Sequence, residues 1–348
     1  MREKIEADGG DRRRRAVLCG VGGYLPPTVV TNDELAVRLD TSDEWIRSRT
    51  GIRTRHVVEP GVATSDLAVP AGAEALRSAG VDLGGHRPVD MVIVATSTPD
   101  HHCPATAPAV ASRLGLPAVP AFDVAAVCSG FVYGLALADG VIASGMAERV
   151  LLIGADTFST ILDSTDRGTA AVFGDGAGAV VLRAGEADEP GALHTVELGS
   201  DGALADLITI RAGGSRHPGR DEVIDQADLW FAMRGQAVYR HAVTRMADAA
   251  RAAMARVGWA PGDVDRFVGH QANIRILDTV GAELGVPAER VYTNVSEVGN
   301  TVAASIPLAL TDAYNAGELR AGDRVVLSAF GGGATWGAAA LTWPDLKN

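Results

Sequence analysis

The chain has 348 residues, of which 47% are hydrophobic and 21% are charged, so it can bury one large core or two fused ones. Its formal net charge of −12 opposes general binding to nucleic acids, whose phosphates would repel it. No segment approaches the roughly 18 apolar residues that a membrane helix needs, and the charged start lacks the apolar core of a signal peptide. We therefore expect a globular, cytoplasmic protein.

The start of the chain includes four consecutive arginines, Arg12 to Arg15, close to two glycines. Such a charged terminus is usually solvated and frayed. We predict a disordered basic arm over residues 1–15, with a nucleic-acid-binding arm as the alternative. Cys19 follows in an apolar run and is expected to pack as a small hydrophobic residue.

Two further segments have distinct local signals. Residues 31–52 predict a capped helix followed by a second helix start, because Thr41 to Glu44 supply N-cap candidates and early acidic residues. Gly174 to Gly178 precede an apolar strand and lack a closing Lys-Ser or Lys-Thr pair. That pattern favours a tight turn over a phosphate-binding loop.

Four landmarks recur in order along the chain and indicate an internal duplication. They are helices ending at Gly80 and Gly258, strands starting at Asp90 and Asp265, helix starts at Cys128 and Asn300, and buried strands at Val150 and Val325. The two members of each pair are separated by a nearly constant offset, close to half the chain length. We predict an α/β fold of two pseudo-symmetric halves, residues 16–185 and 186–348, with the seam near residues 183–195.

Cys128 is the candidate nucleophile. It follows the apolar strand AFDVAAV and opens a helical pattern, so its thiol should face backbone N–H groups and the positive end of a helix. That environment is expected to lower the pKa of the thiol and expose the sulfur for attack. A buried structural cysteine is the competing interpretation when the residue is considered alone.

His270 and Asn300 strengthen the catalytic interpretation, because they lie at the matching strand end and helix start of the second repeat. Strand ends and helix starts of the two halves should converge at the crevice where α/β folds bind ligands. Taken singly, the histidine would be a satisfied core or surface residue and the asparagine a turn or cap residue. The symmetry predicts one pocket that contains all three side chains.

The motifs along residues 16–345 resemble those of β-ketoacyl-acyl-carrier-protein synthase III, a family with the thiolase fold. They are TSDEWIRSRTGIRTRH, FDVAAVCSGF, DRGTAAVFGDGAGAVVL, HQANIRI, GNTVAASIP and FGGGATWG, in family order and spacing. The resemblance implies that acyl-coenzyme A loads a starter group onto Cys128. His270 and Asn300 would then stabilise the enolate formed as malonyl-acyl-carrier protein loses carbon dioxide. The resulting 3-oxoacyl-acyl-carrier protein would initiate fatty-acid or polyketide synthesis.

The resemblance also implies roles for residues around this centre. The backbone amides of Cys128 and Gly332 would form the oxyanion hole. Trp45 and Arg167 would flank the adenine of coenzyme A, with Arg49 close to its phosphates.

Other matched positions fall into three groups: pantetheine-lining Gly235, Tyr239 and Asn273, the acyl-pocket residue Phe330, and the carrier-docking arginines Arg275, Arg251 and Arg256. A solvated helix face remains an open alternative for those arginines. The family further implies a homodimer whose two-fold contact completes each acyl pocket. No metal or redox cofactor is expected, since coenzyme A thioester and phosphopantetheine serve as substrate carriers.

Two positions depart from the family pattern. Cys103 stands before Pro104, where straight-chain family members carry a bulky Phe that reaches the partner's acyl pocket. We hypothesise that Cys103 enlarges this pocket and admits branched or larger starters. A metal cluster of His101, His102 and Cys103 is less favoured, because adjacent side chains rarely point at one ion. Val127 replaces the usual Ala before the nucleophile, and its role cannot be predicted.

Four rival functions share parts of this pattern. A degradative thiolase needs a second cysteine in the C-terminal half, and none follows Cys128. A chalcone-synthase-like enzyme has a different C-terminal loop and a longer chain. A related acyltransferase would pass the Cys128 acyl group to an alcohol or amine, with His270 as general base. A non-catalytic partner subunit could have lost the three polar residues, whereas all three are present.

Overall fold

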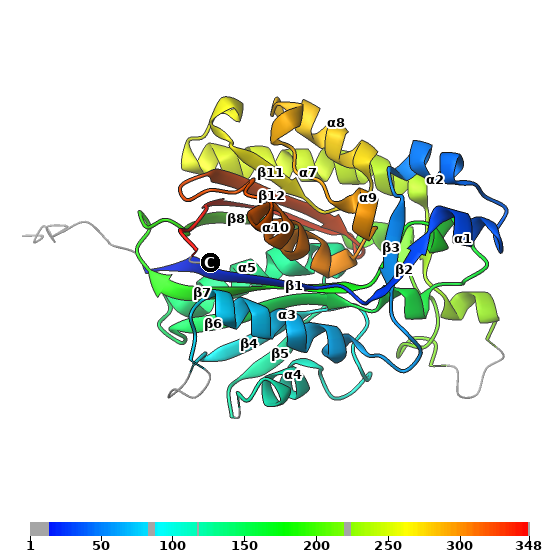
Figure 1. Cartoon of the computed structure of the whole chain (residues 1–348), viewed down its shortest axis with the longest axis horizontal. Helices are drawn as coiled ribbons and strands as arrows, with labels where there is room; N and C mark the ends of the chain where they lie inside the picture. The colour runs from blue at the N-terminus through cyan, green and yellow to red at the C-terminus, as the bar shows by residue number, and fades with distance from the viewer. Residues whose placement is uncertain (1–13, 83–87, 117, 219–223, 347–348) are drawn as a thin grey trace, which may run out of the picture.

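Two β-sheets form the framework of the computed structural model, which describes residues 14–82, 88–116, 118–218 and 224–346 (Figure 1). The five strands of the first sheet follow the order β1-β7-β6-β4-β5. Their bounds are β1 Arg15–Tyr24, β4 Met91–Ala95, β5 Ala121–Val124, β6 Arg149–Asp156 and β7 Gly176–Gly185. The second sheet has the order β11-β12-β13-β8. Its strands are β8 Leu193–Ser200, β11 Arg266–Gly269, β12 Arg324–Gly331 and β13 Thr335–Thr342.

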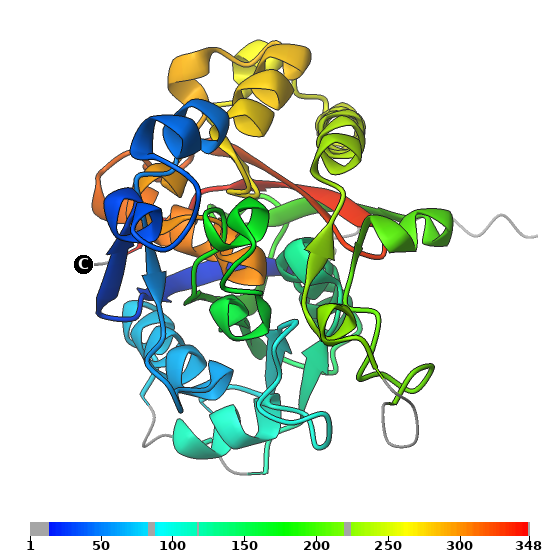
Figure 2. The same ribbon diagram turned by 90° about the vertical axis from the view of Figure 1, so that its right-hand side faces the viewer.

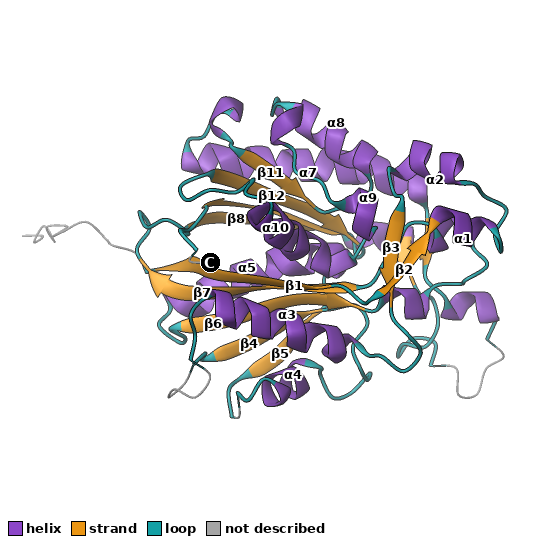
Figure 3. Ribbon diagram, viewed as in Figure 1, coloured by secondary structure: helices purple, strands orange, loops and turns teal. Residues whose placement is uncertain are grey.

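Helices pack on both faces of both sheets, which gives five alternating layers (Figures 1 and 3). The two central helices are α5 Gly130–Ala143 and α10 Ser305–Asn315. Helices α3 Thr64–Ser78 and α4 Ala107–Arg113 cover the outer face of the first sheet, and α7 Gly235–Val257 and α8 Ile274–Leu284 cover that of the second.

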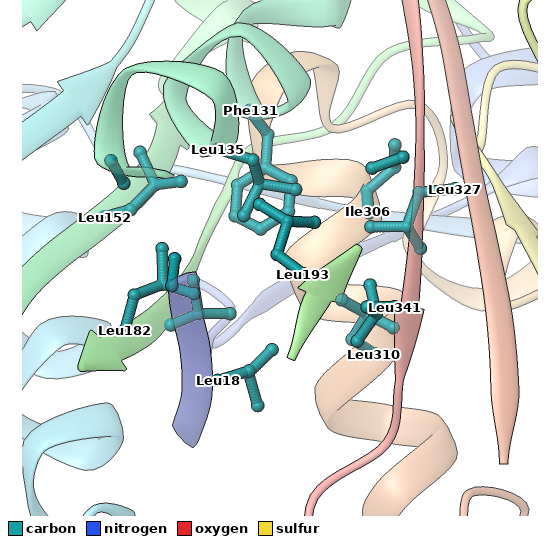
Figure 4. Packing of buried hydrophobic residues seen from close by; sticks show 14 of the residues in the cluster. Leu18, Phe131, Leu135, Leu152, Leu182, Leu193, Ile306, Leu310, Leu327 and Leu341 are labelled. Carbon is teal, nitrogen blue, oxygen red and sulfur yellow. The ribbon is translucent and has the colours of Figure 1, made fainter. Parts of the chain in front are cut away.

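The central helices are buried because both sheets contact them, so their sequences are apolar on nearly every side. Figure 4 shows the core that results, in which leucines of both sheets meet side chains of α5 and α10. The sticks include Leu18 and Leu182 of the first sheet, Leu327 and Leu341 of the second, Phe131 and Leu135 of α5, and Ile306 and Leu310 of α10. This core fixes the distance between the two sheets and hence the place where their strand ends meet.

The predicted duplication is confirmed, and its offset is constant over the central elements. The same number of positions separates the starts of β4 and β11, of α5 and α10, and of β6 and β12. The short 3₁₀ helices that precede the central helices, η1 Val127–Ser129 and η7 Val302–Ala304, keep the same offset. Cys128 therefore corresponds to Ala303 in the second repeat. The prediction that Asn300 is the repeat counterpart of Cys128 was wrong by one turn of helix. Asn300 lies before the turn that leads into α10, where its side chain bonds the backbone of Val302.

Smaller elements decorate the two halves. They are β2 Thr28–Thr31, α1 Asn32–Ala36, α2 Asp43–Thr50, β3 Thr54–Val57, η2 Phe158–Ile161, α6 Arg167–Ala170, η3 Gly202–Leu207, β9 Ile208–Thr209, η4 Gln226–Leu229, β10 Ala232–Met233, η5 Pro261–Asp263, η6 Ala288–Arg290 and α9 Val295–Val298. α2 begins where the sequence predicts, because the Ser42 side chain accepts a hydrogen bond from Trp45 N. Figure 1 shows α1 and α2 together at one end of the molecule, and Figure 2, viewed from that end, shows them side by side.

Gly174 to Gly178 lead into a strand rather than the predicted tight turn, since β7 begins at Gly176. Glycine is needed there for close packing. A Cβ atom on Gly178 would lie 2.5 Å from Leu308 N on α10, and one on Gly174 would lie 2.6 Å from Val298 O. The segment brings the first sheet into contact with the second half next to Asn300.

The N-terminal arm lies mostly outside the described residues, which begin at Arg14. Arg14 donates to Ile142 O and Ala147 O, and Arg15 starts β1 and pairs with Asp139 at 3.1 Å. Strand pairing thus starts just before the predicted boundary. Within the described part of the chain, no helix has the length and apolar character needed to cross a membrane.

Candidate active site

One cavity of about 580 Å³ is lined by Cys128, His270 and Asn300 together. The three residues are almost completely buried, with exposed fractions of 7%, 3% and 4%. They come from η1, from the residue after β11 and from the loop before η7. The two halves therefore place a thiol, an imidazole and a carboxamide around one cavity, as the repeat predicts.

The backbone before Cys128 is held in an unusual conformation. Val127 has a φ of 47°, in the left-handed region that β-branched residues avoid. Val302, its counterpart in the second half, has a φ of 54°. At each strained valine the chain turns from a loop into a central helix. The same backbone conformation therefore positions Cys128 in one half and the Asn300 loop in the other.

The acidity of Cys128 differs from the sequence-based expectation. Burial raises the pKa of the thiol, and the nearby Asp156 carboxyl raises it further, while the backbone amide of Cys128 itself acts in the opposite direction. No Lys or Arg is among the groups that shift this pKa. The position at a helix start is as predicted, but desolvation outweighs it, and the resting thiol is protonated.

His270 is fixed by hydrogen bonds of its backbone and of its ring. Its backbone N–H donates to Ser328 O at 2.8 Å, and its Nδ1 lies 2.6 Å from Ser305 Oγ at the start of α10. Burial lowers the pKa of the imidazole to about 3, so the ring is neutral at physiological pH. With Nδ1 engaged, Nε2 is the nitrogen left to meet a bound molecule.

Asn300 is held by backbone and side-chain contacts alike. Its N–H donates to Val172 O at 2.9 Å, and its carbonyl accepts from Gly174 N at 3.0 Å. Its Oδ1 accepts from Val302 N at 3.0 Å, which assigns the Oδ1 edge of the amide to the protein. The Nδ2 group has no partner among the described residues, so it is available as a donor in a side chain that lines the cavity.

Two glycines approach Cys128 closely: Gly331 at the end of β12 and Gly332 in the loop that follows. A Cβ atom on Gly331 would lie 2.8 Å from Cys128 N, and one on Gly332 would lie 3.2 Å from Cγ2 of Val127. Gly332 does not itself line the cavity, although Phe330 does. The loop is anchored by Thr335, whose hydroxyl donates to Ala126 O at 3.2 Å.

The outer part of the cavity is lined by Trp45, Arg49 and Arg167. Both guanidinium groups already lie over the indole, with Cζ to ring-centre distances of 4.5 Å for Arg49 and 5.0 Å for Arg167. A base stacked between Trp45 and Arg167 would need two contacts of about 3.5 Å each. The predicted adenine slot is therefore closed in this structure, and Asp40 holds Arg167 there through hydrogen bonds of 2.6 Å and 3.2 Å.

The predicted pantetheine positions Gly235, Tyr239 and Asn273 also line the cavity. Asn273 has a structural task, because its side chain caps α8 at Arg275 N and donates to Arg49 O at 2.9 Å. The Tyr239 hydroxyl lies 2.8 Å from Thr279 Oγ1, which joins α7 to α8. Both amide edges of Asn273 are thus engaged with the protein itself.

The predicted docking arginines separate into two groups. Arg275 is exposed and lines the cavity. Arg251 and Arg256 do not line it, and they form ion pairs, Arg251 with Asp248 and Glu283 and Arg256 with Glu197. Those pairs favour the alternative of a solvated helix face.

Cys103 lies apart from the cavity, exposed in the loop between β4 and α4. Among the described residues, no group of three or more His, Cys, Asp or Glu side chains is arranged to hold a metal ion.

Sequence reasoning missed three features of the site. Phe158, Phe173 and Phe231 form a cluster beside Cys128, with ring centres 4.7 to 5.1 Å apart. The other two are Ser305 behind His270 and the buried Asp156 near Cys128. Each is ordinary in the sequence, and only the folded contacts reveal it.

Comparisons with known proteins agree with this architecture. Family profiles match residues 122–202, as 3-oxoacyl-acyl-carrier-protein (ACP) synthase III, and residues 254–343, as the C-terminal part of the same synthase. β-Ketoacyl-acyl-carrier-protein synthase III 3 of Streptomyces coelicolor is 59% identical over 331 residues, covering 95% of this chain and 98% of that protein.

Two crystal structures show the same fold. One is 3-oxoacyl-(acyl carrier protein) synthase III of Pseudomonas aeruginosa PAO1, with a TM-score of 0.88, 51% identity and coverage of 96% of this chain and all of that one. The other is the priming β-ketosynthase of the R1128 polyketide biosynthetic pathway, with a TM-score of 0.88, 34% identity and coverage of 97% and 98%.

Two duplicated α/β halves around a cavity with Cys, His and Asn define a condensing enzyme of the thiolase-like fold. Because the similarity to the Streptomyces synthase spans nearly the whole of both chains, the protein belongs to the β-ketoacyl-acyl-carrier-protein synthase III family.

Proposed function

We propose that the enzyme condenses an acyl group from coenzyme A with malonyl-acyl-carrier protein and releases carbon dioxide. The observation that carries this proposal is the cavity lined by the buried residues Cys128, His270 and Asn300, in which a nucleophile from one half faces two neutral donors from the other. The names of the relatives describe the same reaction class.

The first step is transfer of the acyl group to Cys128. The thiol sulfur bonds to the thioester carbon, and coenzyme A leaves with the thiol proton. Because burial keeps the resting thiol protonated, this proton must leave as the carbon–sulfur bond forms. The closely packed glycine loop beside the Cys128 amide leaves room for the oxyanion, and we assign the donors to Cys128 N–H and Gly332 N–H.

The second step is loss of carbon dioxide from the malonyl group. The electrons of the broken carbon–carbon bond move onto the thioester oxygen as an enolate. A neutral His270 can donate from Nε2 if the Ser305 hydroxyl donates to Nδ1, and Asn300 donates from Nδ2. Donors that are fixed before the reaction need no reorganisation as the charge develops.

The third step joins the two units. The enolate carbon attacks the acyl carbon on Cys128, and the sulfur leaves as a thiolate that takes up one proton. The complete reaction thus consumes one proton per turnover. Each bond formed and broken balances without a change in oxidation state, and His270 and Asn300 supply the donors that the enolate oxygen needs. We therefore propose that no metal or redox cofactor takes part.

Positive charge at the cavity supports thioester carriers with phosphate groups as substrates. Arg49, Arg167, Arg240 and Arg275 are exposed and line the cavity, in a chain whose net charge is −12. We assign Arg49 and Arg167 to coenzyme A, with Trp45 as the surface for the base once Arg167 swings away. We assign Arg275 to the acidic carrier protein. Acyl-coenzyme A and three free cysteines suit a cytoplasmic location.

A homodimer belongs to the same proposal. β5 is an edge strand of the first sheet, and among the described strands it pairs with β4 alone. Such an edge offers unpaired backbone groups to a second copy. Sedimentation should give a mass near twice 36.0 kDa, whereas a mass of 36.0 kDa at working concentrations would rule the dimer out.

The edge strand also relates Cys103 to the starter group. Asp123 of β5 accepts from Thr106 N and Ala107 N, both at 2.7 Å, so the loop that carries Cys103 is tied to this edge. In a dimer through β5 the loop would face the partner, and a small cysteine would leave space for a branched or longer acyl chain. With mixed acyl-coenzyme A donors, acetyl should be outcompeted, and Cys103→Phe should shift the preference toward acetyl. Strict acetyl preference in the wild type would end this part of the proposal.

The deciding experiment separates condensation from simple acyl transfer. Acyl-loaded enzyme should release carbon dioxide from malonyl-acyl-carrier protein and yield a 3-oxoacyl product. If it transferred the acyl group to small alcohols or amines without releasing carbon dioxide, the alternative acyltransferase would be correct. Asn300 favours condensation, because an acyltransferase needs a general base but no second donor to an enolate.

A further inference from the structure

Asp156 is a buried carboxylate that none of the three proposed steps uses. It ends β6, has no exposed surface, and lies close enough to Cys128 to affect the pKa of the thiol. The duplication gives it a counterpart, because β12 matches β6 and ends at Gly331. The ends of these two strands approach the turns at the starts of the opposite central helices.

The residues at the two strand ends make different contacts with those turns. Asp156 Oδ2 accepts a hydrogen bond of 3.1 Å from Ala303 N, in the turn that begins α10. Ala303 is the counterpart of Cys128. At the equivalent place in the other half, a Cβ atom on Gly331 would lie 2.8 Å from Cys128 N and 3.0 Å from Ser129 N. A carboxylate at position 331 would therefore cap the amide that the oxyanion needs, and glycine leaves that amide without such a cap.

The other oxygen of Asp156 is held from its own half. Oδ1 accepts from Ser97 N at 2.7 Å, from Thr98 Oγ1 at 3.1 Å and from Thr96 Oγ1 at 3.3 Å. The carboxylate thus bridges the strand-end loop of the first half and the helix start of the second. Only a group that accepts on both edges can do this, since an amide would present N–H groups to one set of donors.

The bridged turn carries Asn300. Val302 N donates to Asn300 Oδ1, and Ala303 N is the next amide along the chain. Val302 is in the strained left-handed region, with a φ of 54°, so contacts on either side must hold it. Ser305, which contacts His270, follows shortly after Ala303.

We propose that Asp156 is a positioning residue for decarboxylation, which locks the Val302–Ala303 turn and so fixes the amide of Asn300. This inference rests on the proposed condensation. One half of the duplication has a carboxylate at this strand end, and the other half has Gly331 there, which leaves the oxyanion-hole amide uncapped. Asp156 acts through Asn300 and touches neither the substrate nor Cys128.

The charge of Asp156 supplies a second readout that a purely structural residue would not change. Its removal should lower the pKa of Cys128, because the carboxyl is one of the groups that raise it. The rate of alkylation by iodoacetamide follows the thiolate, so its pH profile should move to lower pH.

The test compares Asp156→Asn with Asp175→Asn as a matched control. Asp175 is also fully buried, and its carboxylate also accepts from backbone amides, Val58 N and Ser159 N, but it is not among the groups that shift the Cys128 pKa. Acyl loading of Cys128 is measured by intact mass, and decarboxylation by carbon dioxide release from malonyl-acyl-carrier protein.

Asp156→Asn should load acyl groups within about threefold of the wild type while decarboxylation falls by about 10², the scale of a misplaced catalytic group. Asp175→Asn should leave the ratio of the two rates and the alkylation profile unchanged. Equal losses in both rates for Asp156→Asn, or an unmoved alkylation profile, would overturn the inference. A wild-type enzyme that releases no carbon dioxide would instead contradict the proposed function itself.

Thr98→Val covers the case in which Asp156→Asn does not fold. It removes one donor to Asp156 Oδ1, together with the acceptor of Thr157 N, and keeps the side-chain volume. We expect the same split between the two rates in smaller measure, with decarboxylation lowered by about threefold to tenfold. Unchanged decarboxylation in a folded Thr98→Val enzyme would count against the inference.

Discussion

At the scale of single residues, His270 is a neutral imidazole, and we propose that it binds substrate in this form. Its pKa of about 3 results from burial alone, with no charged partner among the causes. A neutral ring donates from one nitrogen and accepts at the other, so the group on Nδ1 decides what Nε2 can do. The Ser305 hydroxyl, 2.6 Å away, is that group.

Ser305→Ala should therefore slow decarboxylation more than acyl loading. Without the hydroxyl, the proton can reside on either ring nitrogen and the ring loses an orienting contact. We therefore expect the rate of carbon dioxide release to fall by about 10- to 100-fold. Thr311→Val is the control, because Thr311 also presents a buried hydroxyl on α10 but donates it to Pro307 O. Carbon dioxide release that is equal in the two variants would show that Ser305 only supports the helix.

Asp156 also predicts a pH dependence of stability. Burial raises its pKa to about 7 from an ordinary value of 3.8, so between these values the native state keeps a proton that the unfolded chain has lost. This group therefore favours folding at low pH, and its contribution is lost as pH rises from about 4 to 7. Asp156→Asn does not titrate, so its deficit in melting temperature should shrink from pH 4.5 to pH 7.5. A deficit that is independent of pH would contradict the raised pKa.

Sequence reasoning located Cys128, His270 and Asn300 because each is a chemically distinctive residue next to a repeat landmark. Ser305 and Asp156 escaped it because their counterparts are Gly130 and Gly331, so the repeat contains no matching polar residue. The direction of the Cys128 pKa was wrong because a helix start is visible in a sequence and the depth of burial is not.

At the scale of elements, helix α5 shows how packing decides whether a glycine stabilises or destabilises the fold. A Cβ atom on Gly134 would lie 2.4 Å from Leu152 Cδ1, whereas one on Gly140 would meet no atom within 4 Å. Gly134 faces the sheet and Gly140 is exposed. Both would look like equally poor helix residues in the sequence.

Alanine substitutions at these two positions should have opposite effects on the free energy of unfolding. Gly140→Ala should stabilise the protein by about 0.5–1 kcal/mol through reduced backbone entropy in the unfolded chain. Gly134→Ala should destabilise it by about 1–3 kcal/mol because the core must move to accept the methyl group. Urea denaturation of both variants measures the difference, and effects of the same sign would show that α5 does not pack as described.

Element types were predictable where apolar runs and capping residues agree, as in β4, β6 and α2. Gly174 to Gly178 were misassigned because a glycine needed for close approach and a glycine needed for a turn look alike in a sequence. The closed stack of Trp45 and Arg167 was also unpredictable, since it depends on the contact between Arg167 and Asp40.

At the scale of the whole molecule, the duplication explains why Cys128, His270 and Asn300 are buried. Each central helix is covered by both sheets, so the residues at the helix starts are buried when the halves join. The constant offset made this layered architecture predictable from the sequence. The contact between two chains leaves no such periodic signal, which is why the dimer remains a proposal.

The central claim is that one cavity carries both half-reactions on separate groups. Intact mass spectrometry and carbon dioxide release, measured together on wild type, His270→Ala and Asn300→Ala, test it most directly. All three proteins should gain one acyl group, lost in Cys128→Ala, and only the wild type should decarboxylate malonyl-acyl-carrier protein at full rate. An acyl group on another residue, or full decarboxylation by either variant, would contradict the account.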